Sequence, residues 1–194
     1  LWAGTDDGNV WITTDGGAEW TSLNDRIPDN PGYWVSRVEA SYHSPGTAYL
    51  TMTGFHYDDF RPFLYKTTDF GESWSPIADG LPEASVNVIV EDRKNPDLLF
   101  VGTDTRVFVS LDGGESWADF RNDMPVIPVH DLLIHPREND LVVGTHGRGF
   151  FITDISPLQE LTARVQHSDM FLFAVEPKVQ WVMPSQPAVS SQNF

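Results

Sequence analysis

The chain has 194 residues, a formal net charge of −16 and no cysteine. This length corresponds to about one domain, and the absence of cysteine excludes disulfides, thiolate zinc sites and cysteine nucleophiles. The acidic composition also lacks the cluster of Lys and Arg that binding to nucleic acid or to an anionic membrane surface requires. Nineteen of the 28 acids are Asp, and with 15 Gly and 14 Pro they indicate a turn-rich, helix-poor fold, for which 7 Trp and 12 Phe supply a core.

An eight-residue pattern, Ser/Thr-x-Asp-x-Gly-x-x-Trp, occurs at residues 13–20, 67–74 and 110–117. In such an octad the Asp carboxylate can accept backbone N–H groups across its own turn, Gly allows φ > 0, and the Trp ring can pack between sheets. This chemistry predicts a structural role for Asp15, Gly17, Trp20, Asp69, Gly71, Trp74, Asp112, Gly114 and Trp117. The Asp residues suggest calcium as an alternative role for these loops, but one carboxylate per loop is too few for a dedicated oxygen cage, so we expect no metal and no cofactor.

Short apolar segments recur around the octads and predict four strands per repeat, labelled A to D. The chain enters at strand B of one repeat, and each strand D begins at an octad Trp. Later strands A to C are predicted at 86–90, 99–102, 106–110, 129–134, 141–144 and 149–153. Their β-branched and aromatic content and their Gly, Pro, Asn and Asp boundaries are typical of strands. The last repeat has no octad, because Asp154-Ile155-Ser156-Pro157 stands in its place.

Four antiparallel strands per repeat of ~40–50 residues are the signature of a β-propeller blade. The predicted fold is therefore all-β, a β-propeller of four-stranded antiparallel blades, with about three to four blades in residues 1–156. Such a set leaves open sheet edges, which are a liability for pairing and aggregation. We therefore expect a C-terminal fragment of a larger propeller, completed by the rest of its own propeller or by a partner chain.

The C-terminal segment, residues 157–194, differs in character from the repeats. The run Ser156-Pro157-Leu158-Gln159 has the form of a capping box with Ser156 as N-cap, which predicts a short helical turn over about 157–162. Strand-like runs follow at 170–175 and 179–182. The sequence beyond Pro184 is rich in Ser, Gln, Asn and Pro, which indicates an extended tail.

The octads resemble the Asp box, or bacterial neuraminidase repeat. That repeat is found in sialidases, xyloglucan-active glycosidases, sortilin-type receptor domains and photosystem II assembly factors. The segments 143–152 and 154–158 are also similar to the end of the propeller region in large secreted bacterial proteins described as sortilin-like or as repeat-containing glycosyl hydrolases. The resemblance covers about residues 1–160 and implies an extracytoplasmic bacterial protein, secreted or at the cell surface. It leaves the activity open, because enzymes and non-enzymes share the repeat.

The loops between strands B and C are expected on one face of the propeller, away from the octads. These loops carry polar and aromatic residues that could converge on a pocket. The ligand-binding candidates are Asp6, Asp7, His56, Tyr57, Asp58, Asp59, Asp104, Arg106, His146 and Arg148. The alternative is a set of solvated hairpin tips whose Asp residues accept turn N–H groups. His130 and His135 suggest a metal site at first sight, but a chance arrangement is favoured because one lies in a strand and the other in a Pro turn.

Two functional hypotheses follow from these observations. The first is a non-catalytic extracellular or surface scaffold that presents a glycan- or protein-binding face. The alternative is a sialidase-like or xyloglucanase-like glycoside hydrolase acting on polysaccharide, with its catalytic carboxylates partly in missing blades. The scaffold is favoured because every strong motif is structural and no catalytic residue can be assigned. No apolar run approaches the ~20 residues of a transmembrane helix, so membrane insertion is not expected.

Overall fold

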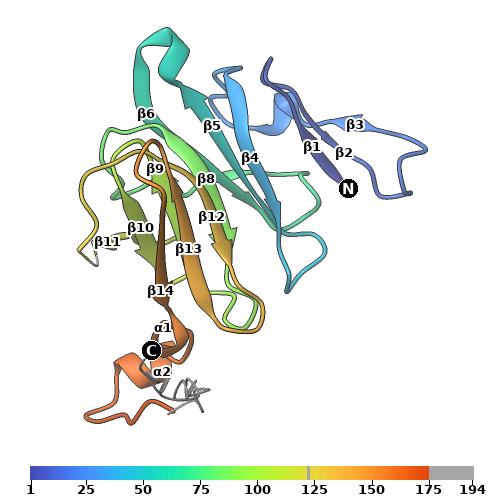
Figure 1. Ribbon diagram of the computed structural model, residues 1–194. Helices are drawn as coiled ribbons and strands as arrows, with labels where there is room; N and C mark the ends of the chain where they lie inside the picture. Colours follow the sequence, from blue (N-terminus) through green and yellow to red (C-terminus); the bar gives the residue numbers. More distant parts are fainter. Residues whose placement is uncertain (122, 175–194) are drawn as a thin grey trace, which may run out of the picture.

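The computed structural model describes residues 1–121 and 123–174, which form four antiparallel sheets in chain order (Figure 1). Blade 1 consists of β1 (Trp2–Gly4), β2 (Val10–Ile12) and β3 (Thr21–Ser22). Blade 2 consists of β4 (Trp34–Ala40), β5 (Ala48–Gly54), β6 (Asp59–Thr67) and β7 (Ser75–Pro76). Blade 3 consists of β8 (Val86–Glu91), β9 (Leu99–Thr103), β10 (Val107–Ser110) and β11 (Ala118–Asp119). Blade 4 consists of β12 (Val129–Ile134), β13 (Asp140–Thr145) and β14 (Phe150–Asp154).

These sheets confirm the predicted all-β propeller fold. Within the described residues, blade 1 contains strands B to D and blade 4 contains strands A to C, as the positions of the octads predict. Of the two incomplete blades, blade 1 lies at the right of Figure 1 and blade 4 lies in front of blade 3. The remaining elements are short: η1 (Asn24–Arg26), η2 (Phe55–Tyr57), α1 (Ser156–Gln159) and α2 (Ala163–Gln166).

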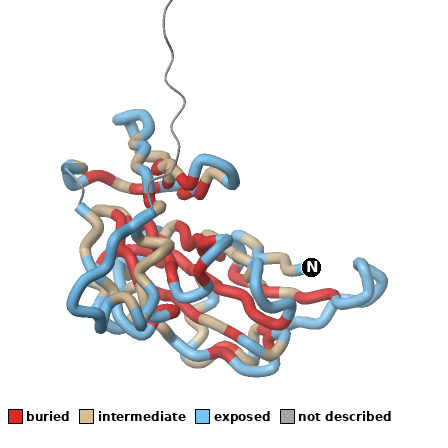
Figure 2. Tube along the Cα trace, turned by 90° about the horizontal axis from the view of Figure 1, so that it is seen from below, coloured by how far each residue is buried: buried red, intermediate tan, exposed pale blue. Residues whose placement is uncertain are grey.

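The hydrophobic core lies in the seams between neighbouring blades. In the first seam Val10 and Leu23 of blade 1 pack in one buried cluster with Val35 and Leu50 of blade 2. Burial of each such side chain contributes ~1.5–3 kcal/mol to folding, so the seams dominate the stability of the fold. Figure 2 shows that the buried residues are concentrated along the strands, while many of the loops are exposed.

Each octad forms a closed turn held by its own side chains. In the second octad Thr67 Oγ1 donates to Asp69 Oδ1 at 2.8 Å and accepts from Gly71 N at 3.0 Å, while Ser73 N donates to Asp69 Oδ1 at 3.0 Å. The first and third octads make the same three contacts. The octad turn therefore uses its Asp as a local acceptor, in the role that its sequence predicts.

The three octad Trp side chains differ in what they contact. Trp117 Nε1 donates to the carbonyl of Ile77 in the preceding blade at 2.7 Å. Trp74 is buried and meets Trp2 of the preceding blade edge to face, with ring centroids 6.0 Å apart. Trp20 belongs to the first blade and is 42% exposed. The predicted packing between sheets therefore holds wherever the described chain supplies a preceding blade.

The helical prediction after β14 requires a correction. The short helical turn predicted over about 157–162 is present as α1, which spans Ser156–Gln159, and a second short helix, α2, follows that was not predicted. Ser156 is not the N-cap, because Ile155 occupies that position and α1 begins at Ser156. The Ser156 N–H donates to Asp154 Oδ1 at 2.9 Å, so an acid from the end of β14 supports this turn.

The strand predicted over 170–175 is wrong for residues 170–174, which form no strand. Instead of pairing in a ladder, Ala174 N donates to the Glu160 carboxylate at 3.2 Å. Residue 175, the run at 179–182 and the tail beyond Pro184 lie outside the described residues. The division into domains at residue 156 remains a prediction.

Gly71 offers a test of seam packing, because a Cβ there would lie 2.7 Å from Leu23 Cδ1 of the preceding blade. Gly17 occupies the same octad position and also has positive φ, but its nearest neighbour would be Trp20 Nε1 at 3.9 Å. We expect Gly71→Ala to lower the free energy of unfolding by ~1–3 kcal/mol more than Gly17→Ala, since only the former overpacks a seam. Urea denaturation of both variants measures the difference, and equal losses would contradict the seam account.

The octad turn also predicts a pH dependence. The hydroxyl of Ser73, followed by the backbone N–H of Ser73 and the hydroxyl of Thr67, lowers the pKa of Asp69 from 3.8 to about 2. Because the folded state depresses this pKa, the contribution of Asp69 to stability is complete above pH 3.8 and is lost as the pH falls toward about 2. NMR titration of the Asp69 carboxyl carbon should show this value, and Ser73→Ala should move it back toward 3.8. An unshifted wild-type titration would refute the prediction.

Candidate functional site

A cavity of about 730 Å³ opens between blades 2, 3 and 4. It is formed by the B–C loops, the loops that lead into strands A, and the first residues of those strands. Its walls are Trp34, Ser36, Thr53, Phe55, His56, Phe60, Glu83, Ala84, Asn87, Asp104, Thr105, Pro128, His130 and His146. The expected convergence of the B–C loops on one face is therefore present in blades 2 to 4.

A β-bulge at the start of each strand A supplies polar groups to the cavity. The pairing with strand B shifts between Val35 and Arg37 in β4 and at the corresponding places in β8 and β12. The extra residue is Ser36, Asn87 or His130, and all three line the cavity. A bulge turns one side chain away from the regular alternation of the strand, which explains why these three residues share a site.

Two of the bulge residues are fixed by hydrogen bonds to the next blade. Ser36 Oγ donates to the Val86 carbonyl at 2.9 Å, and Asn87 Nδ2 donates to the Val129 carbonyl at 3.1 Å. Asn87 Nδ2 also donates to Asp104 Oδ1 at 2.8 Å. The site is thus held by bonds across the seams, and its carboxylate is oriented by a neighbouring amide.

Aromatic rings form much of the remaining wall. Trp34 and His56 are stacked, with ring centroids 5.9 Å apart and planes inclined by 12°, and the indole is 45% exposed. Phe55 and Phe60 meet edge to face beside them, with centroids 6.1 Å apart. Exposed flat rings of this kind offer a platform for the apolar face of a ligand.

The polar lining is acidic rather than basic. Glu83 and Asp104 are the carboxylates of the cavity, and within residues 1–121 and 123–174 no Lys or Arg lines it. His130 and His146 lie side by side, with ring centroids 5.3 Å apart. The described residues contain no group of three or more His, Cys, Asp or Glu that could hold a metal ion.

Three of the ten ligand-binding candidates line this cavity: His56, Asp104 and His146. The other seven candidates lie outside its lining: Asp6, Asp7, Tyr57, Asp58, Asp59, Arg106 and Arg148. Asp7 instead accepts from the Thr5 hydroxyl in its own turn, and Asp58 closes η2 in the left-handed conformation with φ 55°. These two Asp residues match the alternative of solvated hairpin tips.

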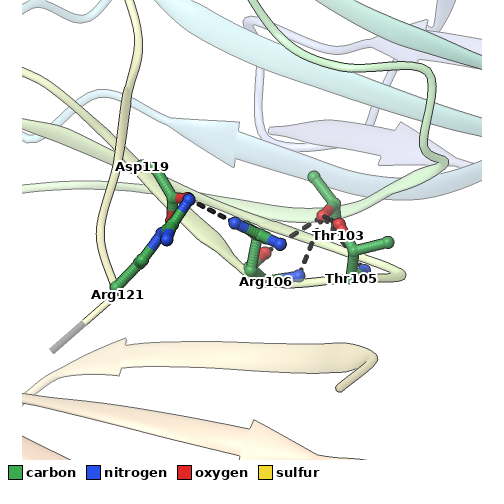
Figure 3. A network of polar contacts seen from close by, with 5 residues as sticks. All are labelled: Thr103, Thr105, Arg106, Asp119 and Arg121. Atoms are coloured by element: carbon green, nitrogen blue, oxygen red, sulfur yellow. Dashed lines mark hydrogen bonds and ion pairs between the residues drawn. The ribbon is translucent and has the colours of Figure 1, made fainter. Parts of the chain in front are cut away.

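Arg106 belongs to a separate network (Figure 3). Its guanidinium pairs with Asp119, which also accepts from Arg121 Nε at 2.7 Å. Burial raises the pKa of Asp119, but the hydrogen bonds from the two Arg side chains outweigh it and leave the pKa lowered. The backbone N–H of Arg106 donates to Thr103 Oγ1 at 3.2 Å, so its loop is also closed locally. Arg106 is therefore committed to an ion pair away from the cavity.

Asp59 and Tyr57 lie on the same hairpin but are occupied by other partners. Arg61 Nη2 pairs with Asp59 Oδ2 at 2.6 Å, and the hydrogen bond from Arg61 lowers the pKa of Asp59 to about 2. Tyr57 stacks on Tyr33, with ring centroids 4.8 Å apart. Both side chains therefore stabilise the lengthened hairpin rather than line the cavity.

Comparison with known proteins supports the propeller fold. No protein-family model matches the chain, and a search of curated proteins finds no match either. Among solved structures, the chain is similar to the Niastella koreensis GH74 enzyme, with 17% identity over 79% of this chain and a TM-score of 0.63. The Xanthomonas campestris GH74 xyloglucanase aligns over 81% of this chain with 17% identity and a TM-score of 0.58. A structure of YCF48 bound to D1 peptide aligns over 79% with 20% identity and a TM-score of 0.57.

The matched region is only part of each of these neighbours. It spans 26% of the Niastella enzyme, 27% of the Xanthomonas enzyme and 47% of YCF48. At this level of identity the likeness shows the fold and not the activity. No helix within the described part of the chain is long and apolar enough to cross a membrane.

Several residues of the cavity were not among the sequence-based candidates. Asn87 and His130 were assigned to strands, and a strand does not reveal its bulge without the pairing register. Trp34 was assigned to no element. Phe55 and Phe60 stood in a lengthened B–C loop beside the candidates, so their composition was a usable signal. His130, which was set aside as a chance neighbour of His135, lies in the cavity with His146.

Proposed function

We propose that this chain is a non-catalytic propeller module whose cavity binds a neutral glycan. The observation that carries the proposal is the combination of an exposed aromatic stack, Trp34 on His56, with hydrogen-bonding groups from three successive bulges in one cavity. A pyranose ring has a flat C–H face and an edge of hydroxyl groups, and this wall offers a partner to each. The proposed location is extracytoplasmic in a bacterium, which rests on the resemblance to secreted bacterial proteins.

The charge of the cavity lining favours a neutral sugar over an acidic one as the ligand. A sialoside or uronate carries a carboxylate, which is normally held by Arg because its guanidinium forms paired hydrogen bonds. Among the described residues no Arg or Lys reaches the lining, whereas Glu83 and Asp104 do. The carboxylate of an acidic sugar would meet like charge here, so the sialidase-like alternative has less support than a neutral ligand.

A glycoside hydrolase remains the second candidate because two carboxylates line the same cavity. An acid pair is the usual requirement for glycosidic hydrolysis. Asn87 donates to Asp104 Oδ1, which orients one of the two groups. The described chain spans about a quarter of the GH74 neighbours, and further catalytic groups could be supplied by other blades. We further propose that the propeller is completed by the rest of its own chain or by a partner chain. A protein ligand at the face that carries the cavity is the alternative to a glycan.

Isothermal titration against neutral oligosaccharides, such as xyloglucan and cello-oligosaccharides, and against sialyllactose tests the binding proposal. Trp34→Ala should weaken binding of the neutral ligand about tenfold or more, because an aromatic platform carries a large part of such a contact. Tyr42→Ala is the matched control, since Tyr42 is an exposed aromatic side chain on the loop between β4 and β5, outside the cavity. Preference for sialyllactose, or equal losses in the two variants, would refute the assignment.

Release of reducing sugar separates the two candidates. We expect no turnover by the wild-type chain or by the completed propeller. If turnover occurs and is abolished by Asp104→Asn or Glu83→Gln while binding persists, the hydrolase is correct and the scaffold is wrong.

A further inference from the structure

The lengthened hairpin of blade 2 carries part of the cavity wall on the short helix η2. Phe55 and His56 of this helix line the cavity, whereas its last residue, Tyr57, does not. The pairing of β5 with β6 shifts register between Met52 and Gly54, so η2 projects beyond the regular ladder. A single helical turn has little stability of its own. The contacts that keep His56 in the cavity wall must therefore come from outside η2.

The segment that leads into β4 contacts η2 with two consecutive aromatic rings. Trp34 stacks on His56, with ring centroids 5.9 Å apart and planes inclined by 12°. Tyr33 stacks on Tyr57, with centroids 4.8 Å apart and planes inclined by 13°. Two neighbouring residues of one segment thus face two neighbouring residues of the other. Because the two stacks are adjacent along both segments, the stack outside the cavity constrains the stack inside it.

Tyr33 contacts the hairpin at every one of its elements. Beyond its stack on η2, its ring meets Phe63 of β6 edge to face, with centroids 5.5 Å apart. Its hydroxyl donates to Asp59 Oδ2 at the start of β6 at 3.2 Å. A Cβ on Gly54, at the end of β5, would lie 2.7 Å from Tyr33 Cε2, so the ring rests directly on the backbone there. The Tyr33 side chain therefore joins β5, η2 and β6.

The segment that carries Tyr33 is in turn fixed to the preceding blade. Val35 N donates to the Thr5 carbonyl of blade 1 at 3.1 Å. In the same B–C loop of blade 1, a Cβ on Gly8 would lie 2.5 Å from the Gly32 carbonyl oxygen, so the two backbones are in close contact. Tyr33 itself packs on the buried cluster between blades 1 and 2. Blade 1 thus supports this segment, and the segment supports η2.

We propose that Tyr33 is a positioning residue for the ligand-binding cavity, although it lies outside the cavity lining. Its ring holds η2 so that His56 is stacked on Trp34 before a ligand arrives. An aromatic wall that is ordered in the free protein does not have to be ordered on binding, which preserves affinity. The effect of Tyr33 on affinity rests on the proposed glycan binding, whereas its effect on the stack does not.

NMR of the unliganded chain tests the effect on the stack. The ring current of the Trp34 indole shifts the proton resonances of the stacked His56 imidazole, which are assigned by comparison with His56→Gln. Tyr33→Ala should move these resonances toward those of a solvated histidine. Tyr33→Phe should leave them in place, because it keeps the ring and Arg61 still binds Asp59. Tyr42→Ala is the control and should have no effect.

A second variant guards against a loss of folding. Tyr33→Leu keeps an apolar side chain against the buried cluster but has no ring to stack on Tyr57. Thermal unfolding followed by circular dichroism shows which variants are folded. Unchanged His56 resonances in folded Tyr33→Ala or Tyr33→Leu overturn the proposal.

Isothermal titration with cello-oligosaccharides tests the effect on affinity. Tyr33→Ala and Tyr33→Leu should weaken binding about fivefold or more, and Tyr33→Phe by about twofold or less, because only the first two lose the ring that orders η2. If the wild type binds and Tyr33→Ala binds equally well, the positioning role is wrong. If the wild type binds no oligosaccharide, the glycan proposal fails, and the His56 resonances still decide whether Tyr33 holds the aromatic stack.

Discussion

The burial of one blade face against the next is the constraint on which the rest of this structure depends. No single sheet of three or four short strands has a core of its own, because each packs its apolar side chains on its neighbours. The octad serves this packing at the outer edge of each blade. Its turn leaves no Cβ at Gly71 or Gly114, where the preceding blade approaches most closely, and its Trp reaches into the same seam. The repeat is therefore a unit of packing rather than a unit of chemistry.

This dependence explains why the fold could be predicted and where the prediction ended. The octads, the alternating strands and the turn residues are local signals, and they specified the blades, their strand order and the incomplete first and last repeats. The C-terminal segment lacks such signals. Ser156 resembled an N-cap, but the acid that supports the turn is Asp154, which the preceding strand places there. The apolar run at 170–174 has the composition of a strand without a neighbour to pair with, and composition alone did not reveal this.

The site was predictable only in part, because it depends on register and on distances between blades. Loop position alone was enough to select His56, Asp104 and His146. It could not separate them from Arg106, whose ion-pair partner Asp119 is supplied by the next strand of the blade. Asp59 pairs with Arg61 on its own strand, and loop position did not reveal that pair either. Nor could it identify Asn87 or His130, which reach the cavity through bulges that are visible only in the pairing of strands A and B. The aromatic residues Phe55 and Phe60 of the B–C loop in blade 2 are a signal in the sequence that points to the same cavity.

The contacts between neighbouring blades also position the side chains of the cavity. Ser36 and Asn87 point into the cavity because each is bonded to a carbonyl of the next blade, Val86 or Val129. The backbone also bonds across the seams, since Val35 N donates to the Thr5 carbonyl of the preceding blade and Ile127 N, which leads into blade 4, donates to the Thr105 carbonyl of blade 3. His130 is the third member of the bulge series, and it lines the cavity in blade 4, which is the last blade that the structure describes. A following blade of the propeller would place its own strand A beside His130, as blade 3 places Val86 beside Ser36. The same packing of blade on blade that forms the core therefore also forms the wall of the cavity.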